Sequence, residues 1–122
     1  MTQRGLISKF DLGDMMMKAY AVVSHFRDDI PEQKEVMKIL KEHLKYFAKC
    51  SEEGKVLIAG PHALEDGSFG GGGVMVLKTS SKKEAEDLMA NDPFVTGNIV
   101  DYTIYEFRVV NLRPELEEWF KS

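Results

Sequence analysis

The sequence contains a single cysteine, Cys50, among its 122 residues. One cysteine cannot form a disulfide within the chain, which fits a reducing compartment. Cations are also few: 16 lysines and arginines stand against 20 aspartates and glutamates, for a formal net charge of −4. Because a nucleic-acid binder needs a surplus of lysine and arginine to neutralise phosphates, we expect no nucleic-acid partner.

Long apolar runs are missing too. The longest, Ala19 to Val23, falls far short of the roughly 20 residues that span a bilayer. The first residues, MTQRG, lack the apolar core of a signal peptide. We therefore expect a cytoplasmic protein with no membrane partner.

What remains is the composition of an ordinary globular domain. Hydrophobic residues make up 43% of the chain and charged residues 30%, which excludes disordered and low-complexity classes. A chain of this length fits one domain with a single core. We divide it into an N-terminal arm at residues 1–14, a domain at residues 15–111 and a C-terminal helical extension at residues 112–122.

The order of sequence patterns predicts the fold class. Aromatic and β-branched runs are typical of strands, whereas apolar residues three or four apart are typical of helices. We expect strands at residues 18–26, 55–61, 74–78 and 99–110, a helix at about 31–53, a helix from the capping box that begins at Ser81 to before Pro93, and a short helix at 114–121. The order βαββαβ predicts an α+β, ferredoxin-like fold with a four-stranded antiparallel sheet.

Apolar side chains lie on both faces of the predicted strands. In the last strand Tyr105 and Phe107 alternate with Tyr102 and Ile104. The helices of this fold cover only one face of the sheet, so the second face needs a partner sheet or the chain termini. We expect a homodimer, and a monomer covered by Trp119 and its neighbour Phe120 is the alternative.

His43 falls within the apolar stripe of the first predicted helix. On a helical projection it lies on the same side as Leu40 and Phe47, whereas the lysines point away. An imidazole buried without a partner is costly. The ring is therefore either a hydrogen-bonded core histidine or part of a cavity wall.

Asp92 precedes Pro93 at the end of the second predicted helix. Turn chemistry alone accounts for it, with Asp92 as an N-cap and Gly97 ending one further turn. The two helices of a βαββαβ fold pack side by side, however, so this carboxylate can reach His43. Such a pair holds the imidazole in one tautomer and provides a general acid or base.

Four glycines, Gly70 to Gly73, follow the turn signal Asp66-Gly67-Ser68. They lead into a strand and not a helix, so the context excludes a phosphate-binding loop. A flexible hairpin loop is the simpler interpretation. The alternative is a gate over a cavity, or N–H groups that face an anionic substrate, with Ser68, Gly72 and Gly73 as candidate substrate-binding residues.

The other side chains that could bind a metal or act as a nucleophile are more simply explained by structural roles. His25, His43 and His62 lack the spacing of a metal site, so we expect no metal. Cys50 lies on the buried stripe and is more simply a small hydrophobic residue than a nucleophile.

Four segments, over about residues 18–110, together resemble the YciI-like (YCII-related) family of the dimeric α/β-barrel superfamily. They are EHL at 42–44, GKVLIAGP at 54–61, DGS with the glycines at 66–73, and the segment from Ala85 through DPF at 92–94 to Gly97. The resemblance implies a homodimeric α/β barrel in which His43 and Asp92 form an active-site pair beside the sheet.

The resemblance also implies a type of chemistry. It points to acid-base catalysis on a small ring compound without an organic cofactor, by an isomerase, a dehydrochlorinase or a related lyase. The alternatives are a non-catalytic ligand-binding or oligomeric assembly module, and an oxygenase of the same superfamily that is cofactor-free or haem-dependent.

Overall fold

The computed structural model describes residues 17–121, so the predicted arm at residues 1–14 lies outside the described residues. The elements are β1 (Met17–Phe26), α3 (Gln33–Glu52), β2 (Val56–Ala63), β3 (Phe69–Leu77), α4 (Lys82–Ala90), α5 (Pro93–Thr96), β4 (Val100–Val109), the 3-10 turn η1 (Pro114–Leu116) and α6 (Glu117–Lys121). This is the predicted βαββαβ order with its C-terminal helix. None of the described helices is both long and apolar enough to cross a membrane.

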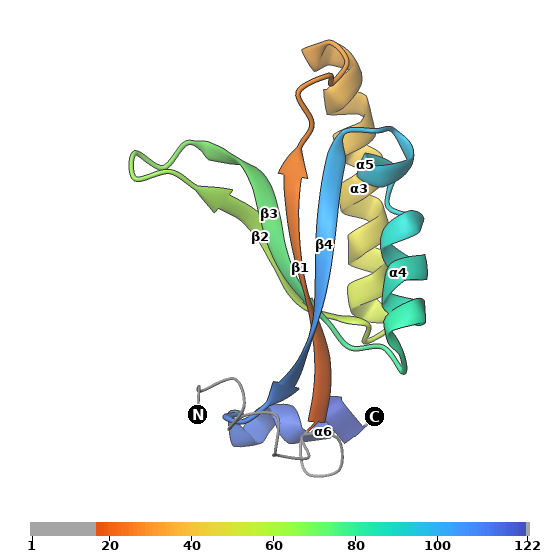
Figure 1. Cartoon of the computed structure of the whole chain (residues 1–122), viewed down its shortest axis with the longest axis vertical. Coiled ribbons are helices and arrows are strands. Elements are labelled where there is room, and N and C mark those ends of the chain that lie inside the picture. The colour runs from red at the N-terminus through yellow and green to blue at the C-terminus, as the bar shows by residue number, and fades with distance from the viewer. Residues whose placement is uncertain (1–16, 122) are drawn as a thin grey trace, which may run out of the picture.

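The strands form one four-stranded antiparallel sheet in the order β2-β3-β1-β4. Helices α3, α4 and α5 lie against one face of the sheet, and α6 lies near the end where β1 begins (Figure 1). This arrangement confirms the predicted ferredoxin-like α+β fold. None of the helices within residues 17–121 lies against the opposite face of the sheet.

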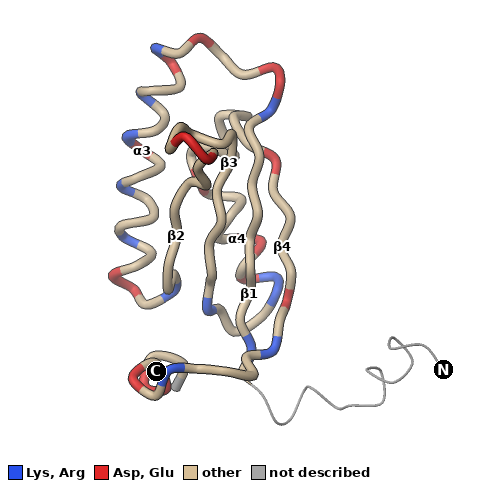
Figure 2. The backbone as a smooth tube through the Cα atoms, turned by 90° about the vertical axis from the view of Figure 1, so that its left-hand side faces the viewer, with Lys and Arg blue, Asp and Glu red and all other residues tan. Residues whose placement is uncertain are grey.

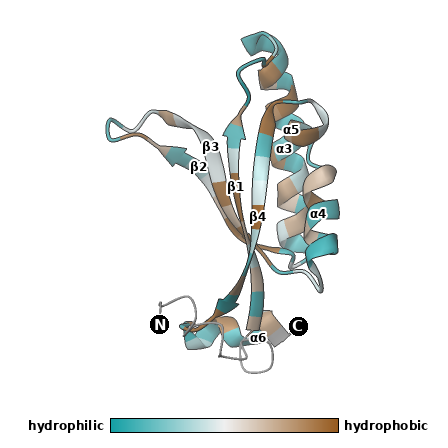
Figure 3. Ribbon diagram, in the orientation of Figure 1, coloured by the Kyte–Doolittle hydropathy of each residue, from teal (hydrophilic) through white to brown (hydrophobic). Residues whose placement is uncertain are grey.

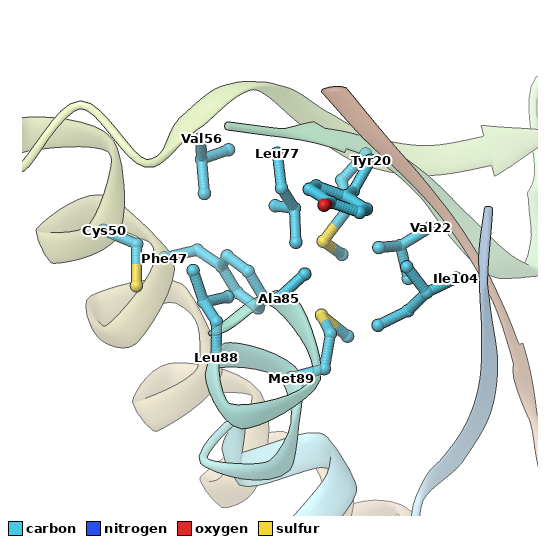
Figure 4. Close-up of a cluster of buried hydrophobic side chains, with 11 residues drawn as sticks. Tyr20, Val22, Phe47, Cys50, Val56, Leu77, Ala85, Leu88, Met89 and Ile104 are labelled. Carbon is cyan, nitrogen blue, oxygen red and sulfur yellow. The ribbon is translucent and has the colours of Figure 1, made fainter. Parts of the chain in front are cut away.

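The main core lies between the helices and the sheet (Figure 4). Tyr20 of β1 is fully buried there and belongs to the same cluster as Phe47 of α3 and Met89 of α4. The two long helices are also joined directly, because the Tyr46 hydroxyl donates to the main-chain oxygen of Leu88 at 2.6 Å. This packing fixes the side chains that α3 points inward.

Helix α4 begins where the capping box predicts. The Ser81 side chain accepts a hydrogen bond from the N–H of Glu84 at 3.1 Å. The return contact differs from the standard box, because the Glu84 carboxylate accepts from the N–H of Ser80 at 3.2 Å instead of that of Ser81. The hydrogen bonds from Ser80 lower the pKa of Glu84.

The glycine run lies inside a strand, which corrects the predicted hairpin loop. Strand β3 begins at Phe69, before the glycines, and pairs Gly73 with Ser24 of β1. The chain reverses earlier, where the N–H of Leu64 donates to the oxygen of Ser68 at 2.8 Å. Glycine weakens an isolated strand, but here strands on both sides supply the pairing, so the run stays in the sheet.

Strand β2 continues through Pro61 to Ala63, beyond its predicted end. A proline is tolerated because β2 is an edge strand, and one of its sides carries no ladder. The pairing with β3 is nevertheless irregular here, with a register shift between Pro61 and Ala63.

The strands contain many hydrophobic residues (Figure 3), and some of them are exposed on the sheet face opposite the described helices. Ile58, Val74 and Tyr105 are 66%, 48% and 57% exposed. The strand register places Ile58 and Tyr105 in one row across the sheet, because Ile58 pairs with Val76, and Ala21 pairs with both Val76 and Tyr105. We call this surface the open sheet face. It stays exposed with α6 in place.

Candidate active site

His43 lies on the side of α3 that contacts the interior, and its side chain is 19% exposed. The imidazole stacks on the ring of Phe94 in α5, with centroids 4.1 Å apart and planes 14° from parallel. It also meets the ring of Phe47 edge-on, with centroids 5.0 Å apart. Contacts with two aromatic rings from different elements restrict the orientation of the imidazole.

Asp92 is buried at the N-cap of α5, the turn that Pro93 opens. Its Oδ1 accepts a hydrogen bond from the N–H of Phe94 at 3.0 Å, as expected of a cap. The same Oδ1 lies 2.6 Å from Nδ1 of His43. One oxygen therefore caps α5 and holds the imidazole.

This contact determines where the proton of the neutral imidazole lies. A carboxylate only accepts hydrogen bonds, so Nδ1 of His43 donates to Asp92 and Nε2 carries the lone pair. No described residue makes a hydrogen bond to Nε2. Within the described residues, every fully enclosed side-chain nitrogen or oxygen of a buried or half-buried residue has a hydrogen-bond partner. Because Nε2 of His43 has no such partner, it is not fully enclosed.

A cavity of about 640 Å³ lies beside the pair, and both His43 and Asp92 line it. Its walls come from α3, α5, the end of β1, and the strands β2 and β3. Four phenylalanines contribute aromatic surface: Phe26, Phe47, Phe69 and Phe94. The volume is that of a typical small-molecule site, and its lining is mostly apolar with few polar groups.

Gly72 and Gly73 also line this cavity. A Cβ at Gly72 would lie 2.0 Å from the backbone oxygen of Ser24, and one at Gly73 would lie 3.0 Å from the backbone oxygen of Gly60. Glycine is therefore required at position 72, and a side chain at position 73 would press on the backbone of β2. The glycine run forms a wall of the cavity made of main chain.

Ser68 is not brought to the cavity. It lies in the turn between β2 and β3, where its N–H and hydroxyl donate to Oδ1 of Asp66 at 2.9 and 2.6 Å. These hydrogen bonds lower the pKa of Asp66. The local turn accounts for both side chains.

Ser24 lines the cavity from β1, and sequence reasoning overlooked it. It is 8% exposed and lies on the helix-facing side of β1, the side that also carries Tyr20, Val22 and Phe26. The signal was present in the sequence, because a serine interrupts a row of large apolar side chains.

The other histidines and the cysteine within the described residues do not form a metal site or a second catalytic site. No group of three metal-ligating side chains occurs within residues 17–121, and His25 and His62 do not line the cavity of His43. Cys50 is 4% exposed, and burial raises the pKa of its thiol.

Comparison with known proteins gives a family and a fold. The family model for the YCII-related domain matches residues 18–108. No curated protein matches the chain. Among solved structures, the chain is similar to 5-chloro-2-hydroxyhydroquinone dehydrochlorinase from Burkholderia phenoliruptrix in complex with 2,5-dihydroxybenzoquinone. The identity is 16% and the TM-score 0.58, over 71% of this chain and 90% of that chain.

Two further structures are more distant. A dimeric ferredoxin-like protein from an uncultured marine organism is 12% identical, with a TM-score of 0.46 over 79% of this chain and 98% of that chain. A protein from Agrobacterium tumefaciens is 13% identical, with a TM-score of 0.42 over 79% of this chain and 97% of that chain.

Proposed function

Because the chain belongs to the YCII-related domain family, we propose that it is a small-molecule enzyme. In this proposal His43 acts as a general acid or base, Asp92 orients it, and the substrate is a small ring compound. The reaction is an isomerisation, a dehydrochlorination or a related elimination, and it needs no organic cofactor.

One observation carries the proposal. Nδ1 of His43 is hydrogen-bonded to a buried carboxylate, Nε2 has no hydrogen-bond partner among the described residues, and His43 lines a cavity of about 640 Å³. A core histidine with a purely structural role has no need of an open nitrogen beside a cavity. An oriented imidazole with one free nitrogen is the usual form of a general base.

The chemistry follows from the lone pair on Nε2. In an elimination, Nε2 accepts a proton from a ring carbon, the C–H electron pair forms a double bond, and chloride leaves with the C–Cl pair. In an isomerisation, the proton returns to a different carbon. In both cases Asp92 keeps the Nδ1 proton in place and stabilises the cationic ring.

The proposal is tested with the purified full chain and a panel of small rings. Chlorinated hydroxyhydroquinones are included because a protein of the same fold is a dehydrochlorinase, and unsaturated lactones are included as isomerisation substrates. Chloride release and NMR spectra report turnover. We expect His43→Gln, which keeps a donor for Asp92, to lower turnover at least about a hundredfold.

Lys45→Gln is the matched control, because Lys45 lies on the same helix with its side chain 76% exposed. It should keep full turnover. The second candidate function is a non-catalytic ligand-binding module, which is favoured by the largely apolar cavity. Specific binding in this cavity without any turnover that depends on His43 would support that function instead.

We also propose that two copies of the chain associate through the open sheet face. Ile58, Val74 and Tyr105 are exposed together there, and Phe107 is 38% exposed. An exposed apolar surface on a sheet of this kind is typical of a subunit interface. The residues that line the cavity come mostly from α3, α5 and the helix-facing side of the sheet, and Ile58, Val74 and Tyr105 are not among them.

A further inference from the structure

We propose that the cavity selects an uncharged ring compound that carries a hydroxyl or keto oxygen, and that Ser24 binds this oxygen. Ser24 lines the cavity from the sheet, whereas His43 lines it from α3. The inference rests on the proposed function, because it names the substrate class of the same cavity.

The charge of the cavity excludes anionic ligands. Within the described residues, no lysine or arginine lines it. The lysines of α3 lie along the outer side of the helix (Figure 2), and Lys38 and Lys41 are exposed there. A carboxylate in the cavity would lose hydration without gaining a cation, and it would approach the carboxylate of Asp92. An uncharged ligand avoids both costs.

The walls favour a flat, apolar ring. The rings of Phe26 and Phe94 meet edge to face, with centroids 5.6 Å apart, and the ring of Phe69 meets that of Phe26 at 4.9 Å. All three line the cavity. Aromatic surfaces of this kind pack against planar rings by stacking and edge contacts.

Ser24 has a hydrogen bond to offer a ligand. Its Oγ accepts from the N–H of Gly73 at 3.1 Å. The hydroxyl proton is directed at the oxygen of Gly73 at 3.4 Å, which is longer than the usual range of about 2.5 to 3.0 Å for a hydroxyl donor. A ligand oxygen at a normal hydrogen-bond distance would therefore be a better acceptor for the Ser24 hydroxyl than the backbone oxygen of Gly73.

The backbone around Ser24 leaves room for such a ligand. A Cβ at Gly73 would lie 3.5 Å from Oγ of Ser24, in contact with the hydroxyl. Because Gly73 has no side chain, this side of Oγ is not covered. Ser24 and Gly73 thus form a small polar spot within apolar walls.

The test is direct binding to the full-length protein, measured by isothermal titration or NMR. The probes are 2-naphthol, 2-naphthoate and naphthalene, which share one ring system. We expect 2-naphthol to bind at least about tenfold more tightly than 2-naphthoate. Ser24→Ala should weaken 2-naphthol about threefold to tenfold and leave naphthalene unchanged. A purely structural role of Ser24 would weaken both probes equally.

A second variant tests whether an added cation makes the cavity accept an anionic ligand. Leu44 lines the cavity and is 58% exposed, so Leu44→Lys places a solvated cation at its edge without burying charge. It should raise the affinity for 2-naphthoate at least about threefold, and the uncharged control Leu44→Gln should not. Equal or tighter binding of 2-naphthoate than 2-naphthol by the natural sequence overturns the inference, as does equal weakening of both probes by Ser24→Ala.

These binding results are independent of turnover. If the selectivity fails while turnover still depends on His43, the ligand class is wrong and the proposed function stands. If the selectivity holds while no turnover depends on His43, the cavity is a binding site of the inferred class and the enzyme proposal fails.

Discussion

Oδ1 of Asp92 lies 2.6 Å from Nδ1 of His43, at the wall of a cavity and at the first turn of a helix. The same oxygen also caps α5 through the N–H of Phe94. One atom thus serves the fold and the proposed chemistry. Substitutions that separate the two roles are therefore the most informative.

Asp92→Asn and Asp92→Ala separate these roles. Asparagine caps a helix as well as aspartate, so the free energy of unfolding should change by less than about 1 kcal/mol. Turnover should still fall at least about tenfold, because an amide does not stabilise the cationic imidazole. Asp92→Ala also removes the helix cap and leaves Nδ1–H of His43 without an acceptor. It should therefore lower the free energy of unfolding by about 2 to 4 kcal/mol. Denaturant unfolding and kinetics measure both; full activity in Asp92→Asn would contradict a role for the carboxylate.

Gly72→Ala should destabilise the protein strongly. Its methyl group would lie 2.0 Å from the backbone oxygen of Ser24, and backbone cannot move aside cheaply. We expect a loss of at least about 2 kcal/mol in urea unfolding. Gly60→Ala is the control, because a Cβ there meets no atom within 4 Å, and it should change stability by less than about 0.5 kcal/mol. Equal effects would contradict the close approach of β3 to β1.

Tyr105→Lys should dissociate the proposed dimer. The substitution places a charge on the open sheet face, on the edge strand β4, where Tyr105 is 57% exposed. A charge buried without a partner disfavours association, so sedimentation velocity should shift from dimer to monomer. Ala48→Lys adds the same charge on the exposed side of α3 and should leave the dimer intact. A natural chain that is monomeric at micromolar concentration would rule out the interface.

Glu84→Gln should change the pH dependence of stability. Hydrogen bonds from Ser80 lower the pKa of Glu84 from its ordinary value of 4.5, so the folded state favours the ionised form. This contribution is present above the unfolded pKa and is lost as the pH falls through the folded pKa. The stability difference between Glu84→Gln and the natural sequence should therefore shrink on acidification below pH 4.5. Ser80→Ala, which removes the hydroxyl that donates to the Glu84 carboxylate, should reduce the same pH-dependent contribution.

The sequence was sufficient to predict the fold and to select His43 and Asp92. Periodicity placed His43 on the inner side of its helix, and the step from Asp92 to Pro93 located the end of α4. The distance between the two side chains was out of reach, because it depends on how α3 packs beside α5. Local patterns do not encode that packing.

The glycine run and Ser24 show where sequence rules fail. Glycine runs suggest loops because glycine has low strand propensity. Here the neighbouring strands pair with the run and hold it in the sheet. The row of apolar side chains in β1 marks Ser24 as unusual, but its contact with Gly73 across the ladder could not be read from its neighbours in the chain.

The main-chain wall at Gly72 and Gly73 has a consequence for how the cavity adapts to different ligands. Backbone in a paired strand has no rotamers, so that side of the cavity is a fixed template. The opposite side carries Met37, Leu40 and Leu44, which are flexible and on one helix. Relatives with different substrates should therefore differ in the α3 side chains that line the cavity, while their β3 strands keep glycine and the same backbone path.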